Sequence, residues 1–251
     1  MKKTLLTLSL IAAFPCIMNA QSFILGAKIG YNTTWLMNKN VFDQDEDLNP
    51  NTSFGANFGL SGYFYFNDKV GVGAEIHSMT VNQKYSGEFN DNPNISFDAK
   101  ETVKVIDIPI LLQLTNESGL YFEVGPKITL INSAEMEFEV TPTQSPSVNF
   151  SGRDVIEGYN STLISGVFGF GVNISAGENL FITTGIRLAS SFSDATKEFT
   201  EDELGHLAMD DKLGISSIFA HTNQSGNYKY EKTTLATGGI ILGIFYRFGG
   251  N

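Results

Sequence analysis

Alternation between apolar and polar residues, repeated along most of the chain, is the feature that most limits what this sequence can fold into. In residues 53–66, the even positions carry mainly phenylalanine, leucine and alanine, whereas the odd positions carry glycine, asparagine, serine and tyrosine. Successive side chains of a β-strand point to opposite faces, so this pattern predicts a strand with a different solvent on each face. A tight turn at residues 67–69 leads into a second alternating run over 70–85, and the two runs together predict a hairpin.

The same alternation predicts eight strands in all. They span residues 22–37, 53–66, 70–85, 102–115, 120–133, 160–175, 180–192 and 234–249. Short turns follow the second, fourth and sixth strands, whereas the other strands lead into long polar segments. These segments lie near residues 38–52, 86–101, 134–159 and 193–233. Short turns at one end and long loops at the other are typical of an antiparallel up-and-down transmembrane β-barrel, with short periplasmic turns and long extracellular loops.

Length and charge disfavour several other classes of protein. The longest apolar stretches, residues 108–112 and 238–246, are far shorter than the ~20 residues of a helical membrane span. The formal net charge of −11 offers no cationic surface for a phosphate backbone, so we expect no nucleic-acid partner. The single cysteine cannot build a disulfide framework or a cysteine-rich metal site.

The start of the chain has the pattern of a secretory signal peptide. A positively charged beginning is followed by an apolar run over residues 5–17 and by a cleavage site near Ala20. Lipidation at Cys16 is the less favoured alternative, because the two residues before it are not small. We therefore expect residues 1–20 to be removed on export, and residues 21–251 to form one barrel domain in the outer membrane.

The direction of the alternation distinguishes a membrane barrel from a water-soluble one. A soluble eight-stranded barrel places its large apolar residues inside, whereas a membrane barrel places them against lipid. Seven charged residues share the polar, glycine-rich face, namely Lys28, Glu75, Asp107, Glu123, Lys127, Arg187 and Arg247. Burying them in a dry core would be too costly, but four cations and three anions can pair inside a lumen. We therefore predict a structural ion-pair network in the lumen, in which Asp107 meets Lys127.

Aromatic residues on the apolar face fit the same orientation. Trp35 lies at the loop end of the first predicted strand, and Phe66, Phe122 and Phe248 lie at the turn ends of three others. Belts of aromatic side chains mark the two interfaces of a membrane-spanning barrel. The apolar face is therefore expected to contact lipid.

Three segments have the residues of a known family. They are residues 25–32, Leu-Gly-Ala-Lys-Ile-Gly-Tyr-Asn, residues 105–112, Val-Ile-Asp-Ile-Pro-Ile-Leu-Leu, and residues 243–248, Gly-Ile-Phe-Tyr-Arg-Phe. In these segments the chain resembles the outer-membrane β-barrel family common in Bacteroidota, whose members include the PorT-like proteins. The resemblance implies export, barrel assembly and an outer-membrane location. PorT-like proteins are associated with protein secretion, so it also implies a link to a secretion assembly.

No group of residues predicts a catalytic, cofactor or metal site. His77, His206 and His221 have no ligand-like spacing to a cysteine or a pair of carboxylates. His77 and Ser78 are adjacent, so they point to opposite faces of a strand and cannot act as base and nucleophile together. The acidic run over residues 43–47 lacks the glycine and glutamate positions of a calcium loop, which favours a solvated loop.

Two long connections are predicted to carry structure of their own. Residues 200–203, Thr-Glu-Asp-Glu, resemble a helix capping box, and the apolar residues that follow predict a short helix. The glutamates at 135, 137 and 139 alternate with apolar residues, which predicts that the fifth strand projects above the membrane as an arm. Pro142 and Pro146 are expected to end it.

The expected function is a structural or interaction role in the outer membrane, linked by the resemblance to protein secretion. The interior of an eight-stranded barrel is just filled by side chains, so open diffusion of solutes is not expected. A narrow small-solute channel and a lipid-modifying barrel enzyme are the alternatives, although we expect no enzyme activity. The expected partners are outer-membrane lipid, lipopolysaccharide and other envelope proteins, with no cofactor.

Overall fold

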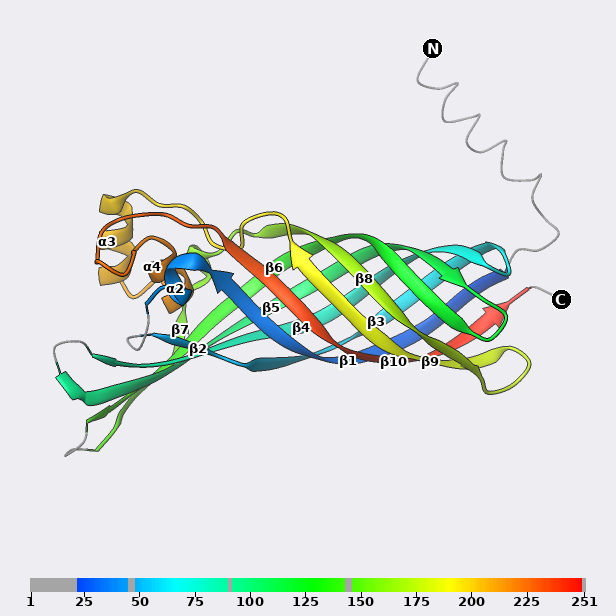
Figure 1. Ribbon diagram of the computed structural model, residues 1–251, viewed down its shortest axis with the longest axis horizontal. Helices are drawn as coiled ribbons and strands as arrows, with labels where there is room; N and C mark the ends of the chain where they lie inside the picture. Colours follow the sequence, from blue (N-terminus) through cyan, green and yellow to red (C-terminus); the bar gives the residue numbers. More distant parts are fainter. Residues whose placement is uncertain (1–21, 45–47, 90–91, 143–145, 250–251) are drawn as a thin grey trace, which may run out of the picture.

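The computed structural model describes residues 22–44, 48–89, 92–142 and 146–249, in which eight strands close into one antiparallel barrel (Figure 1). The barrel strands are β1 (Ser22–Asn38), β3 (Ser53–Asn67), β4 (Val70–Phe89), β5 (Asn92–Thr115), β6 (Leu120–Pro142), β8 (Thr162–Ser175), β9 (Leu180–Ser191) and β10 (Thr233–Phe248). Each pairs with the next barrel strand, and β1 pairs with β10 to close the ring. The predicted eight-stranded barrel is confirmed. The predicted signal peptide and its cleavage near Ala20 lie outside the described residues.

Short turns and long connections lie at opposite ends of the barrel, as predicted (Figure 1). The long connections contain two short strands, β2 (Asn49–Asn51) and β7 (Val148–Asp154), and the 3-10 helix η3 (Ile156–Gly158). They also contain the helices α2 (Lys39–Phe42), α3 (Glu201–Met209) and α4 (Ile215–Ala220). The predicted helix is confirmed as α3, because Thr200 and Glu203 form its capping box. Among the described residues, no helix is long and apolar enough to cross a membrane.

One predicted loop is a pair of strands instead. Residues 86–101 were expected to be a polar connection, but β4 continues to Phe89 and β5 begins at Asn92. The reason is that alternation persists there with its sense reversed, so that Phe97 and Ala99 point inward and are buried while Asp98 is exposed. The charged residues at the outward positions give this segment the polar composition of a loop.

The strands on one side of the barrel are much longer than those on the other. β5 and β6 have 24 and 23 residues, whereas β8 and β9 have 14 and 12. At about 3.3 Å per residue, the additional ten or so residues extend about 30 Å beyond the barrel rim. This extension, with β2 and β7 at its sides, is called the arm, and Figure 1 shows it at the lower left. The arm predicted from the alternating glutamates is confirmed, and β6 ends at Pro142.

The half of the barrel nearer the short periplasmic turns, here called the lower barrel, has an apolar outer surface. Large apolar side chains are exposed on every barrel strand, among them Ile29, Phe58, Ile76, Ile110, Val124, Phe168, Ile186 and Ile240. At the turn end, Phe66, Phe122 and Phe248 are all exposed on this surface. Such a band fits a hydrocarbon environment bounded by an aromatic belt.

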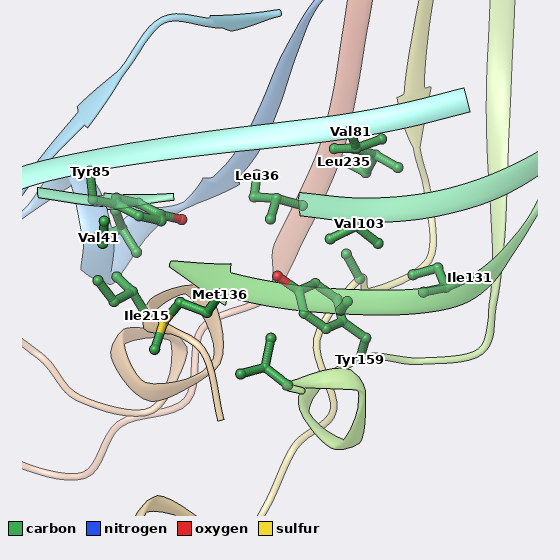
Figure 2. Packing of buried hydrophobic residues seen from close by; sticks show 14 of the residues in the cluster. Leu36, Val41, Val81, Tyr85, Val103, Ile131, Met136, Tyr159, Ile215 and Leu235 are labelled. Carbon is green, nitrogen blue, oxygen red and sulfur yellow. The ribbon is translucent and has the colours of Figure 1, made fainter. Parts of the chain in front are cut away.

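The upper part of the barrel interior, nearer the long connections, is a largely apolar core. Figure 2 shows side chains from β1, β4, β5, β6 and β10 that pack inside the wall, including Leu36, Val81, Val103, Ile131 and Leu235. Val41 of α2 and Ile215 of α4 join the cluster from above, as does Tyr159, which follows η3. The long connections therefore close the extracellular end of the barrel, a role that the sequence analysis did not predict for them.

Candidate functional site

A cluster of buried charges occupies the lower interior, below the apolar core. Six of the seven residues predicted for the lumen contribute to it from five strands, namely Lys28 on β1, Glu75 on β4, Asp107 on β5, Glu123 and Lys127 on β6, and Arg187 on β9. Small neighbours leave room for these long side chains. In the register, Gly169 lies between Glu123 and Arg187, and a Cβ atom there would come within 2.6 Å of Glu123 Oε1.

Arg187 joins two carboxylates from different parts of the wall. Its Nη1 donates to Glu75 Oε2 at 2.6 Å and its Nε donates to Glu123 Oε1 at 2.7 Å. Lys28 Nζ donates to Glu75 Oε1, also at 2.6 Å, and Tyr63 Oη donates to the same oxygen. Glu75 therefore accepts from three strands at once, because its neighbours come from β1, β3 and β9.

The remaining pair bridges two neighbouring strands. Lys127 Nζ donates to Asp107 Oδ2 at 2.9 Å, and Thr129 Oγ1 donates to Asp107 Oδ1 at 2.5 Å. The structure thus brings Asp107 and Lys127 together at the distance of an ion pair. His77 lies beside this cluster, with Nε2 3.1 Å from Glu75 Oε2.

The six formal charges of the cluster cancel, because three are cationic and three are anionic. Balanced pairing offsets the large cost of removing charges from water, and it links strands across the lumen. The arrangement fills the lumen and cross-links its wall.

Arg247 is not part of this cluster. It is exposed at the periplasmic mouth, where its guanidinium lies 5.8 Å from the centre of the Phe181 ring. There it lines a cavity of about 320 Å³ together with Asp68, Glu117 and Glu178, one from each short turn. Arg247 lies outside the cluster because it is the second-last residue of β10, at the periplasmic rim of the barrel.

A second buried carboxylate, which sequence reasoning missed, lies in the apolar core. Glu101 is fully buried, and its Oε1 accepts from Ser216 N of α4 at 2.9 Å. Its Oε2 accepts from Tyr159 Oη at 2.5 Å and from Ser216 Oγ, which also meets Tyr85 Oη at 2.7 Å. Burial raises the pKa of the Glu101 carboxyl, while the hydrogen bonds from Ser216 and Tyr159 oppose that rise. Glu101 thereby ties α4 to the barrel wall.

The signal for Glu101 was present in the sequence. It lies on the same face as Ala99 and Val103, at alternate positions of β5. A charged residue on an otherwise apolar inward face indicates a buried hydrogen-bond acceptor. Assigning residues 86–101 to a loop hid that pattern.

The histidines occupy three different environments. His77 lies in the lumen and His206 is exposed on α3. His221 is buried at the end of α4, beside the rings of Phe199 and Tyr230. In the parts of the chain that the structure describes, no group of three or more histidine, cysteine, aspartate or glutamate residues could hold a metal ion.

The solved structures to which this chain is similar include three small outer-membrane proteins. The crystal structure of Neisserial surface protein A is 11% identical and covers 92% of this chain and 100% of its own, with a TM-score of 0.37. OprG from Pseudomonas aeruginosa is 14% identical, covers 92% of this chain and 97% of its own, and has a TM-score of 0.41. Ail of Yersinia pestis is 13% identical and covers 92% and 100%, with a TM-score of 0.31.

The sequence comparisons identify the family. No curated protein matches the chain. The family described as "Outer membrane protein beta-barrel domain" matches residues 19–145, which is just over half of the 251 residues and includes the first five barrel strands. This chain therefore belongs to the outer membrane protein beta-barrel domain family.

Proposed function

We propose that this protein is a closed barrel that interacts with other envelope molecules through its extracellular arm, and that it is not a solute pore. The observation that carries the proposal is the filling of the lumen at two levels. The charged cluster occupies the lower lumen, and α2 and α4 pack over an apolar core above it. A solute would have to displace both layers to pass.

Single-channel recording tests the closed state. Purified full-length barrel in a planar bilayer is expected to give no steady current steps under an applied voltage. An open barrel of larger size, reconstituted in the same way, serves as the positive control. Steady unitary currents from this protein would overturn the closed state and favour the narrow-channel alternative.

The arm is the element that we propose for contact with partners. Its side strand β7 pairs only with β6 among the described strands, and it exposes Val148 and Phe150 far from the lipid-facing band. Exposed apolar side chains on an open sheet edge are typical of surfaces that meet another chain. The proposed partners are other envelope proteins, including a secretion assembly, while lipid and lipopolysaccharide surround the barrel.

Co-purification from the native outer membrane tests this role. The tagged full chain is expected to retain specific envelope proteins after gentle extraction, and the double variant Val148→Ser, Phe150→Ser is expected to lose them. Met209→Ser is the matched control, because Met209 is an exposed apolar residue on α3 and not on β7. Equal recovery of partners with both variants would overturn the role of the arm, and a barrel that always runs alone would overturn the interaction role.

We also propose a non-catalytic role. The imidazole nitrogens of the two buried histidines face Glu75 in one case and backbone groups of Ser217 and Phe199 in the other. Neither histidine is placed to activate a serine hydroxyl in this way. An unchanged lipid A profile on overexpression is the expected result, and a changed one would favour the lipid-modifying enzyme.

A further inference from the structure

Three buried polar atoms without a hydrogen-bond partner surround one small cavity in the lumen. They are Asn32 Nδ2 on β1, Asn57 Oδ1 on β3 and His77 Nε2 on β4. All three residues line a cavity of about 30 Å³, to which Lys127 and Arg187 of the charged cluster also contribute. The cavity therefore lies where the charged cluster meets the residues above it, such as Met79.

These atoms are well shielded from bulk solvent. Asn32 is 4% exposed and His77 is 3% exposed. The polar atom that lies beside His77 Nε2 is Glu75 Oε2, at 3.1 Å. Leaving a buried donor or acceptor unpaired costs about 1–3 kcal/mol, and native interiors rarely do so. The two asparagine atoms, with His77 beside them, point to a polar ligand that binds in this cavity.

The mixture of donors and acceptors defines the chemistry of that partner. Asn32 Nδ2 can only donate, whereas Asn57 Oδ1 can only accept. A cation would face Asn32, Lys127 and Arg187, while an anion would face Asn57 and the Asp107 carboxylate. The surrounding ion pairs already cancel, so neither sign of charge is favoured. A ligand that donates and accepts satisfies both atoms.

We propose that the cavity is a binding site for ordered water, which accepts from Asn32 Nδ2, donates to Asn57 Oδ1 and contacts His77 Nε2. The volume fits about one or two water molecules, since a site needs roughly 10–15 Å³ for each. This water completes the polar layer between the charged cluster and the apolar core. The inference does not depend on the proposed contact role of the arm.

Nuclear magnetic resonance of the full chain in lipid nanodiscs tests the site. The expected result is a cross-peak between water and the side-chain amide hydrogens of Asn32, with the sign of a long-lived, bound water. The matched control is Asn38, an equally buried asparagine whose Nδ2 bonds to Glu231 O and Thr233 Oγ1. It is expected to show no such cross-peak. Absence of the cross-peak at Asn32 would overturn the proposal.

A variant and an ion substitution separate the remaining outcomes. Asn57→Ala removes the acceptor without filling the cavity, so the water cross-peak of Asn32 is expected to weaken severalfold. An unchanged cross-peak would overturn the bridge between the two residues. A crystal soaked in bromide is expected to show no anomalous signal in the cavity, and a bromide peak there would replace water with an anion.

Discussion

The two halves of the barrel interior are built from the same strands but from opposite kinds of residue. In the lower half, six charges pair with one another inside a wall whose outer surface is apolar. In the upper half, leucine, valine and tyrosine fill the interior, while lysine and glutamate cover the outside. The difference follows the surroundings, because the outer surface meets lipid below and water above. Each half therefore places apolar side chains on whichever face is away from water.

β5 shows both arrangements along a single strand. Below, Asp107 points inward while Ile106, Ile108 and Ile110 point outward. Above, Val103 and Val105 point inward, and Lys104 points outward to lie 3.9 Å from Glu135. The direction of each side chain still alternates, but the chemistry exchanges faces between Val105 and Ile106. That point marks the outer boundary of the lipid-facing surface.

Neutralising Glu75 is expected to have the largest effect on this comparison. Glu75→Gln leaves Lys28 and Arg187 buried with fewer negative partners, and breaking a buried ion pair in this way costs about 3–5 kcal/mol. Urea unfolding in lipid vesicles, followed by the fluorescence of Trp35, measures the loss. The control Glu117→Gln breaks a long, exposed pair with Lys69 and is expected to change nothing measurable. Equal stability of the two variants would show that the cluster does not stabilise the barrel.

Truncating the apolar core is expected to have the next largest effect. Leu163 is fully buried in the upper half, and Leu163→Ala is expected to reduce the free energy of unfolding by about 3 kcal/mol through lost burial and a cavity. Leu60→Ala is the matched control, because Leu60 is 65% exposed on the lipid face, where lipid can fill the space. The same urea unfolding measures both. A larger loss for Leu60→Ala would contradict the assignment of the upper interior as the apolar core of the barrel.

Removing the Ser216 hydroxyl is expected to loosen the extracellular closure without unfolding the barrel. Ser216 Oγ links Tyr85 to Glu101, so Ser216→Ala is expected to cost about 1–2 kcal/mol, locally at α4. Faster proteolysis within residues 193–232 is the readout, with unfolding of the barrel unchanged. Ser225→Ala, at an exposed site of the same connection, is the control and is expected to leave the proteolysis rate at its original value.

Acid is expected to have the smallest effect, confined to the surroundings of His221. Phe199 N donates to Nε2 and Nδ1 meets Ser217 O, so the neutral ring is the form that fits. Burial lowers the pKa of the His221 imidazole, although the bond to Ser217 and the charges of Glu198 and Asp194 oppose this. Because the folded form has the lower pKa, its stabilisation is present above the ordinary histidine value of about 6.5 and is lost as pH falls through the lowered pKa.

Hydrogen exchange of the Phe199 amide, corrected for the intrinsic effect of pH, measures this loss. Protection is expected to decrease on acidification in the original chain. His221→Gln offers the same donor and acceptor without titrating, so it is expected to remove the pH dependence. His206→Gln, on the exposed face of α3, is expected to preserve the pH dependence of Phe199 protection. If this variant loses the pH dependence and His221→Gln keeps it, the titrating group is His206.

The fold could be predicted from sequence because alternation reports directly on strands and their ends. Short-range patterns, in which the relevant residues lie only a few positions apart, predict the eight barrel strands, the α3 capping box and the projecting β6. The contact between Asp107 and Lys127 could be predicted as well, because β5 and β6 are neighbouring strands joined by a short turn. The direction of the alternation then identified the face that carries the charges.

What could not be predicted depends on long-range packing. Glu101 meets Ser216 across 115 positions of the chain, and no spacing rule connects them. The exchange of faces above the membrane made residues 86–101 resemble a loop, since the expected pattern of a membrane strand had ended. Arg247 had the correct parity for the lumen but lies too close to the periplasmic rim to reach Glu75 or Glu123. Whether a position in a strand is odd or even determines which face its side chain points to, but not how deep in the lumen it lies.

The long strands of the arm have a mechanical consequence. β4, β5 and β6 pass from the periplasmic turns to the arm as paired strands. The register shifts at Asn132, an extra residue of β6 opposite β5, and again near the tip, after Glu88 of β4. A strand of 23 residues is about 75 Å long, so the arm is a continuous extension of the membrane-spanning strands and not a flexible loop. A sideways pull at its tip would be carried by shear along backbone hydrogen bonds. A force applied to the arm would therefore be transmitted through these strands to the periplasmic side of the barrel.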